Sequence, residues 1–286
     1  MTDRATYEGR PLAHPDEDIF DQGLAFDVGT LLDRRGMLKL MGWSGLFVLA
    51  GCAAPGATPL ASTVAPAPSS AASGTTTVIP EETGGPFPGD GSNGPDVLTQ
   101  SGVVRRDIRS SFGSASGVAG GVPLTIEFSV LDASNGFKPL AGAAIYVWHC
   151  DRDGNYSLYS QGVTAENYLR GVQAASKDGL VTFTSVFPAC YAGRWPHIHF
   201  EVYPSLAAAT DPANRIATSQ IALPEASCVA VYATDGYSQS VTNLGQVSLA
   251  TDMVFGDDLA VHELGAMSGS ITAGMTVALT VAVNTA

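Results

Sequence analysis

The residues of this chain best suited to bind a metal are two histidines in the stretch YAGRWPHIHF, at 191–200. His197 and His199 stand two positions apart, and on a β-strand such side chains project from the same face. Two neutral imidazoles on one face can bind a single ion. The sequence after them, FEVY, alternates like a half-buried strand, which favours a ligand pair over two histidines on a solvated strand face.

Zinc suits this neighbourhood poorly, because the sequence offers no third nearby histidine, no cysteine pair and no HExxH helix to complete a common zinc site. The remaining candidate ligands are tyrosines, namely Tyr191 and the Tyr156 of DRDGNYSLY. A phenol has a pKa of about 10 in water, so it binds as phenolate only to a strongly Lewis-acidic ion such as ferric iron. Tyrosines are also common core residues of β-proteins, so residue types alone do not decide whether these tyrosines are metal ligands.

The elements that must position these side chains are short strands. Apolar and β-branched runs bounded by Gly, Pro, Asp or Asn predict strands over 123–132, 143–151, 179–187, 197–203, 217–223 and 275–283. Helical periodicity is weak, and only 224–233 and 240–249 are candidate short helices. The pattern predicts an all-β fold, an antiparallel β-sandwich with long loops and one or two short helices.

Three segments of different composition divide the chain of 286 residues. We expect an export signal over 1–51, a flexible tether over 52–79 and one globular domain over 80–286. The tether contains Ala, Pro, Ser, Thr and Gly but little bulky apolar surface, so it cannot form a core.

The export signal is recognised by its charges and its short apolar run. Arg34 and Arg35, with Lys39 close behind, resemble the twin-arginine export motif. The run over 40–50 is roughly eleven residues long, well short of the roughly twenty that a membrane-spanning helix needs. The sequence LAGC at its end resembles a bacterial lipoprotein processing box, which would make Cys52 the lipidated first residue of the mature protein. We therefore expect export across the bacterial inner membrane, to a periplasmic, lipid-anchored surface or secreted location.

Net charge and cysteine content limit the classes of partner and the disulfides that this chain can have. The chain carries 27 acidic against 14 basic residues, a net charge of −13, which argues against nucleic acid. We expect membrane contact only through a lipidated N-terminus, and a monomer or homodimer. In an oxidising compartment, Cys150, Cys190 and Cys228 allow one disulfide and one free thiol. The sequence leaves the pairing open, and we favour Cys190 with Cys228.

Two longer segments carry a family resemblance. VWHCDRDGNYSLY and FPACYAGRWPHIHFEVY resemble the signature segments of the intradiol ring-cleavage dioxygenases. The resemblance implies a mononuclear non-haem Fe(III) held by Tyr156, Tyr191, His197 and His199, with Tyr159 as the alternative to Tyr156. It also implies that Arg194 lies over the bound ring and that Gln220, in TSQIAL, accompanies it.

A third segment, ETGGPFPGDG at 82–91, resembles the family's pocket-lining sequence and implies substrate contacts for Gly85, Pro86 and Phe87. Gly84 stands where the family usually has glutamate. The implied substrates are O2 and a small aromatic diol, whose ring opens between the hydroxylated carbons to a muconate-type dicarboxylate. In this mechanism the diol displaces Tyr191, which then acts as a base, while Arg194 offsets negative charge on the ring. No external reductant is needed, and no nicotinamide or flavin motif is expected.

Two other functions compete with this interpretation. A secreted β-sandwich on a tether could be a binding module, and the same histidine pair could serve a zinc-dependent hydrolase. The sequence does not identify the diol. A carboxylated substrate would require a further cation in the pocket, and Arg170 is the residue to examine for that role.

Overall fold

The computed structural model describes residues 6–7, 10–11 and 76–285. Most of the predicted export signal, Cys52 and most of the predicted tether lie outside the described residues. At the N-terminal end, β1 (Thr6–Tyr7) pairs in antiparallel fashion with β2 (Arg10–Pro11). Within the described ranges, no helix has the length and apolar character needed to span a lipid bilayer.

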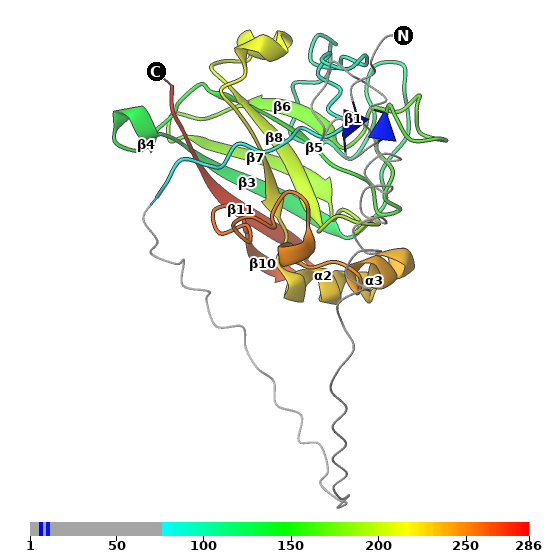
Figure 1. Cartoon of the computed structure of the whole chain (residues 1–286). Coiled ribbons are helices and arrows are strands. Elements are labelled where there is room, and N and C mark those ends of the chain that lie inside the picture. Colours follow the sequence, from blue (N-terminus) through cyan, green and yellow to red (C-terminus); the bar gives the residue numbers. More distant parts are fainter. Residues whose placement is uncertain (1–5, 8–9, 12–75, 286) are drawn as a thin grey trace, which may run out of the picture.

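Two facing sheets form the domain (Figure 1). The first contains β10 (Ala266–Ser270), β11 (Gly274–Val283), β3 (Pro123–Asp132), β4 (Lys138–Pro139) and β7 (Leu180–Val186). The second has the order β6 (Arg170–Ala174), β5 (Ala144–Trp148), β8 (His197–Tyr203) and β9 (Ala217–Ala222). All pairs in the two sheets are antiparallel except β11 with β3. The predicted all-β sandwich is confirmed.

Alternating side chains build the core between the sheets. On β3 every second residue from Leu124 to Val130 is buried, and β11 follows the same alternation beside it. The opposite sheet contributes Ile198, Phe200 and Val202 from β8 to the same core. The rings of Phe128 and Phe200 meet across the interface with centroids 5.2 Å apart. Because side chains of a strand alternate, the odd-numbered residues of β8 face away from this core, toward the long loops that cover the sheet.

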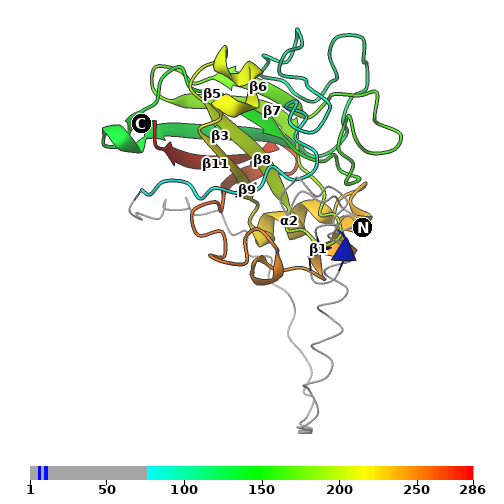
Figure 2. The same ribbon diagram turned by 45° about the horizontal axis from the view of Figure 1, so that its top comes forward.

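Short helices close one end of the sandwich (Figure 2). They are α2 (Glu225–Tyr232), which directly follows β9, and α3 (Ser238–Leu244). The 3-10 turns are η2 (Ala133–Asn135), η3 (Ala208–Thr210), η4 (Pro212–Asn214) and η5 (Leu249–Thr251). The buried face of α2 joins the main core, where the rings of Tyr232 and Phe187 lie 5.8 Å apart.

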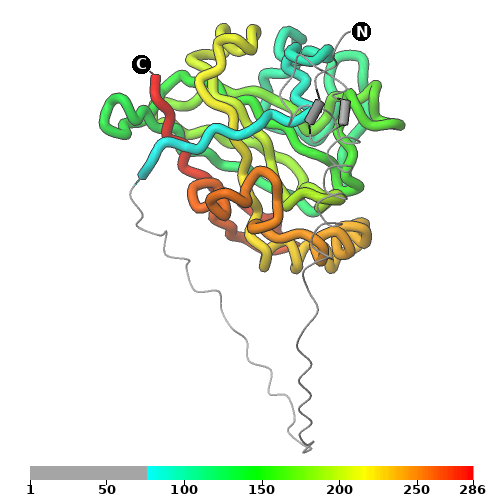
Figure 3. The backbone as a smooth tube through the Cα atoms, viewed as in Figure 1, coloured from blue at the N-terminus to red at the C-terminus, as the bar shows by residue number. Residues whose placement is uncertain are grey.

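The last residues of the predicted tether, Val78 and Ile79, pair with the described fold. Val78 forms a parallel bridge with Ala282, and the Ile79 amide donates to the Ala282 carbonyl at 2.9 Å. From there the chain passes along β9, where the Glu82 amide donates to the Thr218 carbonyl at 2.8 Å. Figure 3 shows this segment, in cyan, crossing the sheet from the C-terminus toward the loops. The apolar Ile79 side chain, which is 5% exposed, joins the core between the sheets.

The predicted Cys190–Cys228 disulfide is wrong, because Cys150, Cys190 and Cys228 are all free, buried thiols. Cys190 Sγ donates to the Arg194 carbonyl at 3.5 Å, and Cys228 Sγ donates to the Leu223 carbonyl at 3.8 Å. Buried thiols of this kind pack as small apolar side chains with a weak donor. The number of cysteines in a chain does not reveal such local partners.

Candidate metal centre

Four side chains converge on one point at the outer face of β8. His197 Nε2 lies 3.3 Å from Tyr156 Oη, 3.2 Å from Tyr191 Oη and 3.1 Å from His199 Nε2. The two phenol oxygens lie 3.5 Å apart. The structure therefore brings together the four residues that the sequence singled out as metal ligands.

The strand fixes both imidazoles. His199 pairs with Trp148 of β5 on one side and with Gln220 of β9 on the other, and its ring stacks on the Trp148 indole at 4.8 Å. His197 Nδ1 donates to the Trp195 carbonyl at 2.6 Å, and this bond leaves the Nε2 lone pair free for a metal. Both rings are almost fully buried.

The two tyrosines come from loops that pack against each other. The Asp151 carboxylate accepts from the amides of Asp153 and Asn155, which shapes the turn before Tyr156. Gly154 lies in this turn with φ of +88°, and a Cβ there would sit 3.2 Å from Tyr191 Cβ. Glycine thus permits both the turn and the close approach of the two loops. Tyr156 is 2% exposed, whereas Tyr191 is only partly buried.

The donor set fits ferric iron. Burial lowers the pKa of His197 and of His199 well below the ordinary value, and the charge of Arg194 adds to this effect. For His199 the neighbouring His197 imidazole contributes as well. Both rings are therefore neutral ligands. Burial raises the pKa of Tyr191 to about 12 and that of Tyr156 well above its ordinary value. Only a strongly Lewis-acidic ion would remove these phenol protons near neutral pH. Within the described residues no group of three or more His, Cys, Asp or Glu side chains is placed to hold a metal, so an ion here needs the tyrosines.

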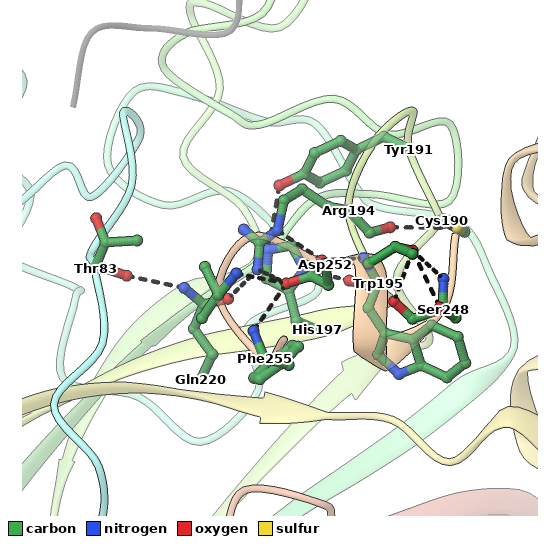
Figure 4. Close-up of polar contacts among 12 residues, drawn as sticks. Thr83, Cys190, Tyr191, Arg194, Trp195, His197, Gln220, Ser248, Asp252 and Phe255 are labelled. Atoms are coloured by element: carbon green, nitrogen blue, oxygen red, sulfur yellow. Dashed lines mark hydrogen bonds and ion pairs between the residues drawn. The ribbon is translucent and has the colours of Figure 1, made fainter. Parts of the chain in front are cut away.

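Arg194 lies beside this cluster and is held from two sides (Figure 4). Its Nε donates to Asp252 Oδ2 at 3.0 Å, and its Nη2 donates to Gln220 Oε1 at 2.7 Å and approaches Asp252 Oδ1 at 3.5 Å. Gln220 is fully buried and its Nε2 donates to the Thr83 carbonyl at 2.9 Å, so both ends of its amide are engaged. Asp252 was missed by the sequence analysis, because no motif marks it and it follows Arg194 by 58 residues.

Residues 82–91, whose sequence resembles the family's pocket-lining segment, form the pocket wall beside the histidines. Gly85 has φ of +67°, and a Cβ there would lie 3.4 Å from His199 Cε1. The Phe87 ring lies 5.0 Å from Tyr156 and 5.1 Å from Tyr159. The Pro86 carbonyl accepts from Asn93 Nδ2 at 2.8 Å. All three sequence-predicted pocket residues therefore belong to one wall.

The Tyr159 hydroxyl is hydrogen-bonded to the pocket wall and its neighbour Asn93. Its hydroxyl donates to Asn93 Oδ1 at 2.7 Å and accepts from the Gly89 amide at 2.9 Å. Tyr156, by contrast, directs its oxygen at His197 and Tyr191. The geometry favours Tyr156 over Tyr159 as the ligand.

Arg170 is a structural residue in the described fold. It is 1% exposed, and its guanidinium donates to Ser157 Oγ, the Ser157 carbonyl, the Pro88 carbonyl, Tyr146 Oη and the Phe87 carbonyl. A guanidinium has five N–H donors, and these contacts use all of them. Arg170 therefore has no donor left for the carboxylate of a ligand.

Acidic side chains gather beyond the pocket wall. Glu263 is fully buried, and within the described chain the Glu82 carboxyl is the one hydrogen-bond partner of its side chain. Burial and the nearby carboxylate of Glu82 raise the pKa of Glu263 to about 8. Burial, together with Asp257 and Asp258, raises the pKa of Glu82 to about 7. The two carboxyl groups thus share a site in which one is neutral near pH 7.

Known proteins resemble this chain in sequence and in fold. A family model described as a dioxygenase matches residues 94–210. A chlorocatechol 1,2-dioxygenase from Rhodococcus opacus is 41% identical over 63 residues, which are 22% of this chain and 24% of that protein. The match thus spans about a quarter of the length of this curated relative.

The structure of an intradiol ring-cleavage dioxygenase from Tetranychus urticae matches with a TM-score of 0.58 and 22% identity, covering 73% of this chain and 95% of that chain. At that identity the likeness establishes the shared fold.

Proposed function

The chain belongs to the intradiol ring-cleavage dioxygenases, and from this premise we propose that it opens the ring of a small aromatic diol with O2. The proposed cleavage lies between the two hydroxylated carbons and yields a muconate-type dicarboxylate. The observation that carries the proposal is the convergence of two phenols and two imidazoles within 3.5 Å, with Arg194 beside them.

Tyr156, Tyr191, His197 and His199 are the residues that would hold the iron. Bound there, Fe(III) would supply Lewis acidity to a chelated diol and accept electron density from its ring. His197 is kept in its ligand tautomer by the Trp195 carbonyl, so it requires no rearrangement. The stacked Trp148 ring holds His199 and shields it from water.

Tyr191 and Arg194 are the proposed catalytic residues. Tyr191 is more exposed than Tyr156, which supports Tyr191 as the phenol that gives way to the diol and accepts one of its protons at Oη. Arg194 uses Nε and Nη2 for protein partners, so Nη1 is the part of the guanidinium available to a ligand. A fixed cation at this position would stabilise negative charge that develops on the ring.

The proposed diol carries no carboxylate substituent. Arg170, the cation that such a group would need, has all of its donors occupied, and Arg194 is already paired with Asp252. Glu82 and its acidic neighbours would also repel an anion on their side of the pocket wall. We further propose that the enzyme acts outside the cytoplasm, which rests on Arg34, Arg35 and Cys52 of the export sequence.

Spectroscopy of the full chain, purified with iron, tests this function. We expect a broad visible charge-transfer band that shifts to longer wavelength when catechol is added without oxygen, and that is absent in His197→Ala. On admission of ¹⁸O2 both oxygen atoms should appear in a ring-opened dicarboxylate, detected by mass spectrometry. A colourless protein that holds stoichiometric zinc and leaves catechol intact would refute the dioxygenase and favour the hydrolase.

A further inference from the structure

Asp252 occupies the junction between the arginine and one of the candidate metal ligands. Its carboxylate is 0% exposed and is divided between two tasks. Oδ1 accepts from the amides of Val254 and Phe255, at 2.9 and 3.1 Å. Oδ2 accepts from Arg194 Nε at 3.0 Å and from the Trp195 amide at 2.6 Å. Oδ1 therefore shapes the residue's own turn, with a longer contact of 3.5 Å to Arg194 Nη2, and Oδ2 fixes the 194–195 segment.

The turn that presents Asp252 is itself closed by short-range contacts. In η5, Ser248 and Thr251 form a reciprocal capping box, and the Asp252 amide donates to the Ser248 carbonyl at 2.9 Å. Phe255, at the end of the turn, is fully buried with its ring 5.9 Å from the Arg194 guanidinium carbon. Figure 4 shows Asp252 between Arg194 and Trp195, with Phe255 below.

The contacts of Asp252 reach the candidate metal ligands through a single residue, Trp195. The Trp195 amide donates to Asp252, and the Trp195 carbonyl accepts from His197 Nδ1 at 2.6 Å. Arg194 is 9% exposed, and burial of such a cation without a counterion is costly. Asp252 supplies that counterion with fixed geometry, since Nε and Nη2 both face its carboxylate.

We propose that Asp252 is a positioning residue of this enzyme, which holds the Arg194 guanidinium in the orientation that leaves Nη1 for the diol. This role rests on the proposed function, and Asp252 lies outside residues 94–210, where the family model matches. Asp252 does not contact the diol in this proposal. It acts through Arg194, so its effect on turnover must disappear when Arg194 is removed.

A double-mutant cycle on the iron-loaded full chain tests the proposal. Asp252→Asn keeps one acceptor oxygen and replaces the other with an NH2 group that cannot accept, so it cannot serve both the 194–195 segment and the amides of Val254 and Phe255. We expect kcat for catechol to fall about 10²-fold, comparable with the loss of one stabilising donor, with a smaller change in KM. Arg194→Ala should cause a similar fall, and the double variant should be no slower than Arg194→Ala alone.

A second variant separates positioning from folding. In Asp252→Ser the hydroxyl can still cap the turn at Val254 and Phe255 but cannot reach Arg194. It should reproduce the loss of kcat with a smaller loss of melting temperature than Asp252→Asn. Asp211→Asn is the matched control, because Asp211 caps a turn remote from the site through the Ala213 amide and should keep the kcat of the wild type.

The same cycle is measured on the metal-free chain by thermal unfolding, where coupling between Asp252 and Arg194 should also appear. If Asp252→Asn lowered kcat by the same factor in the wild type and in the Arg194→Ala background, the positioning role would be overturned. A wild-type protein that cleaves none of a panel of diols would instead refute the proposed function, and the unfolding cycle would then decide whether Asp252 holds Arg194.

Discussion

Arg170 Nη1 donates a hydrogen bond of 2.6 Å to the carbonyl of Pro88, a residue 82 positions earlier in the sequence. This contact joins β6 to the pocket wall. A second bond, from Nη2 to the Ser157 carbonyl, joins β6 to the residue next to Tyr156. A buried guanidinium with five acceptors is thus part of the framework that aligns the wall with the tyrosine loop.

Arg170→Met should therefore destabilise the whole domain. Loss of the guanidinium leaves several buried acceptors unpaired, and we expect the free energy of unfolding to fall by about 3 kcal/mol or more. Urea denaturation measures this, with the exposed Arg106→Met as a control expected within about 0.5 kcal/mol of the wild type. A variant as stable as the wild type that lost only turnover of carboxylated diols would instead make Arg170 a binding residue.

Tyr156→Phe and Tyr159→Phe should differ in their iron content. The Tyr156 oxygen points at His197 and Tyr191, so its removal should abolish stoichiometric iron and the visible band. Tyr159 hydrogen-bonds the pocket wall at Gly89 and Asn93, so its removal should leave iron bound and change mainly KM. Metal analysis and absorption spectra check both variants, and the opposite pattern would make Tyr159 the ligand.

Glu263→Gln should reduce the pH dependence of stability. The pKa of Glu263 in the folded protein, about 8, is raised above its ordinary value of 4.5, chiefly by burial. The neutral form is therefore favoured in the folded state, and its stabilising effect is lost as pH rises from about 4.5 through 8. At about 1.4 kcal/mol per pKa unit the loss amounts to a few kcal/mol.

Denaturation of wild type and Glu263→Gln between pH 5 and 9 measures this effect. The variant should be the more stable protein at pH 9, and its stability should vary less with pH. The exposed Glu127→Gln should follow the wild type. Parallel curves for Glu263→Gln and wild type would show that the Glu82–Glu263 pair does not titrate in this range.

Gly85→Ala should impair diol binding specifically. An alanine at φ of +67° is strained by about 1–2 kcal/mol, and its methyl group would contact His199 at 3.4 Å. Gly113→Ala is a matched control, because Gly113 has φ of +69° but no atom within 4 Å of an added Cβ. Both variants should lose similar stability, while only Gly85→Ala should raise the Kd for catechol in an anaerobic titration.

Strands with strong alternation could be predicted from the sequence, and weaker strands could not. The predicted strands over 123–132 and 197–203 coincide with β3 and β8, because each has a continuous apolar face. β6, with the sequence RGVQA, and β10, with AMSGS, were missed, since neither alternates clearly between apolar and polar residues. The parallel pairing of β11 with β3 was not predictable either, because no local pattern specifies a partner 151 residues away.

The candidate site could be predicted where its residues lie in contiguous motifs. Tyr191, Arg194, His197 and His199 occur within nine residues, and a single loop and strand bring them together. Asp252 and Glu263 come from a later segment and meet the site only through the packing of that segment. The partners of Arg170 were hidden for the same reason, since three of its acceptors are backbone carbonyls that any residue could supply.

The bond between Ile79 and Ala282 has a consequence for the order in which the site can form during synthesis. The pocket wall follows Ile79 directly, whereas β11 is the last strand of the described chain. A nascent chain that has already made both histidines and both tyrosines holds this wall through β9 but still lacks its second anchor, in β11. A ribosome-bound chain that ends before β11 should therefore bind diols more weakly than the full chain, even when its ligands are complete.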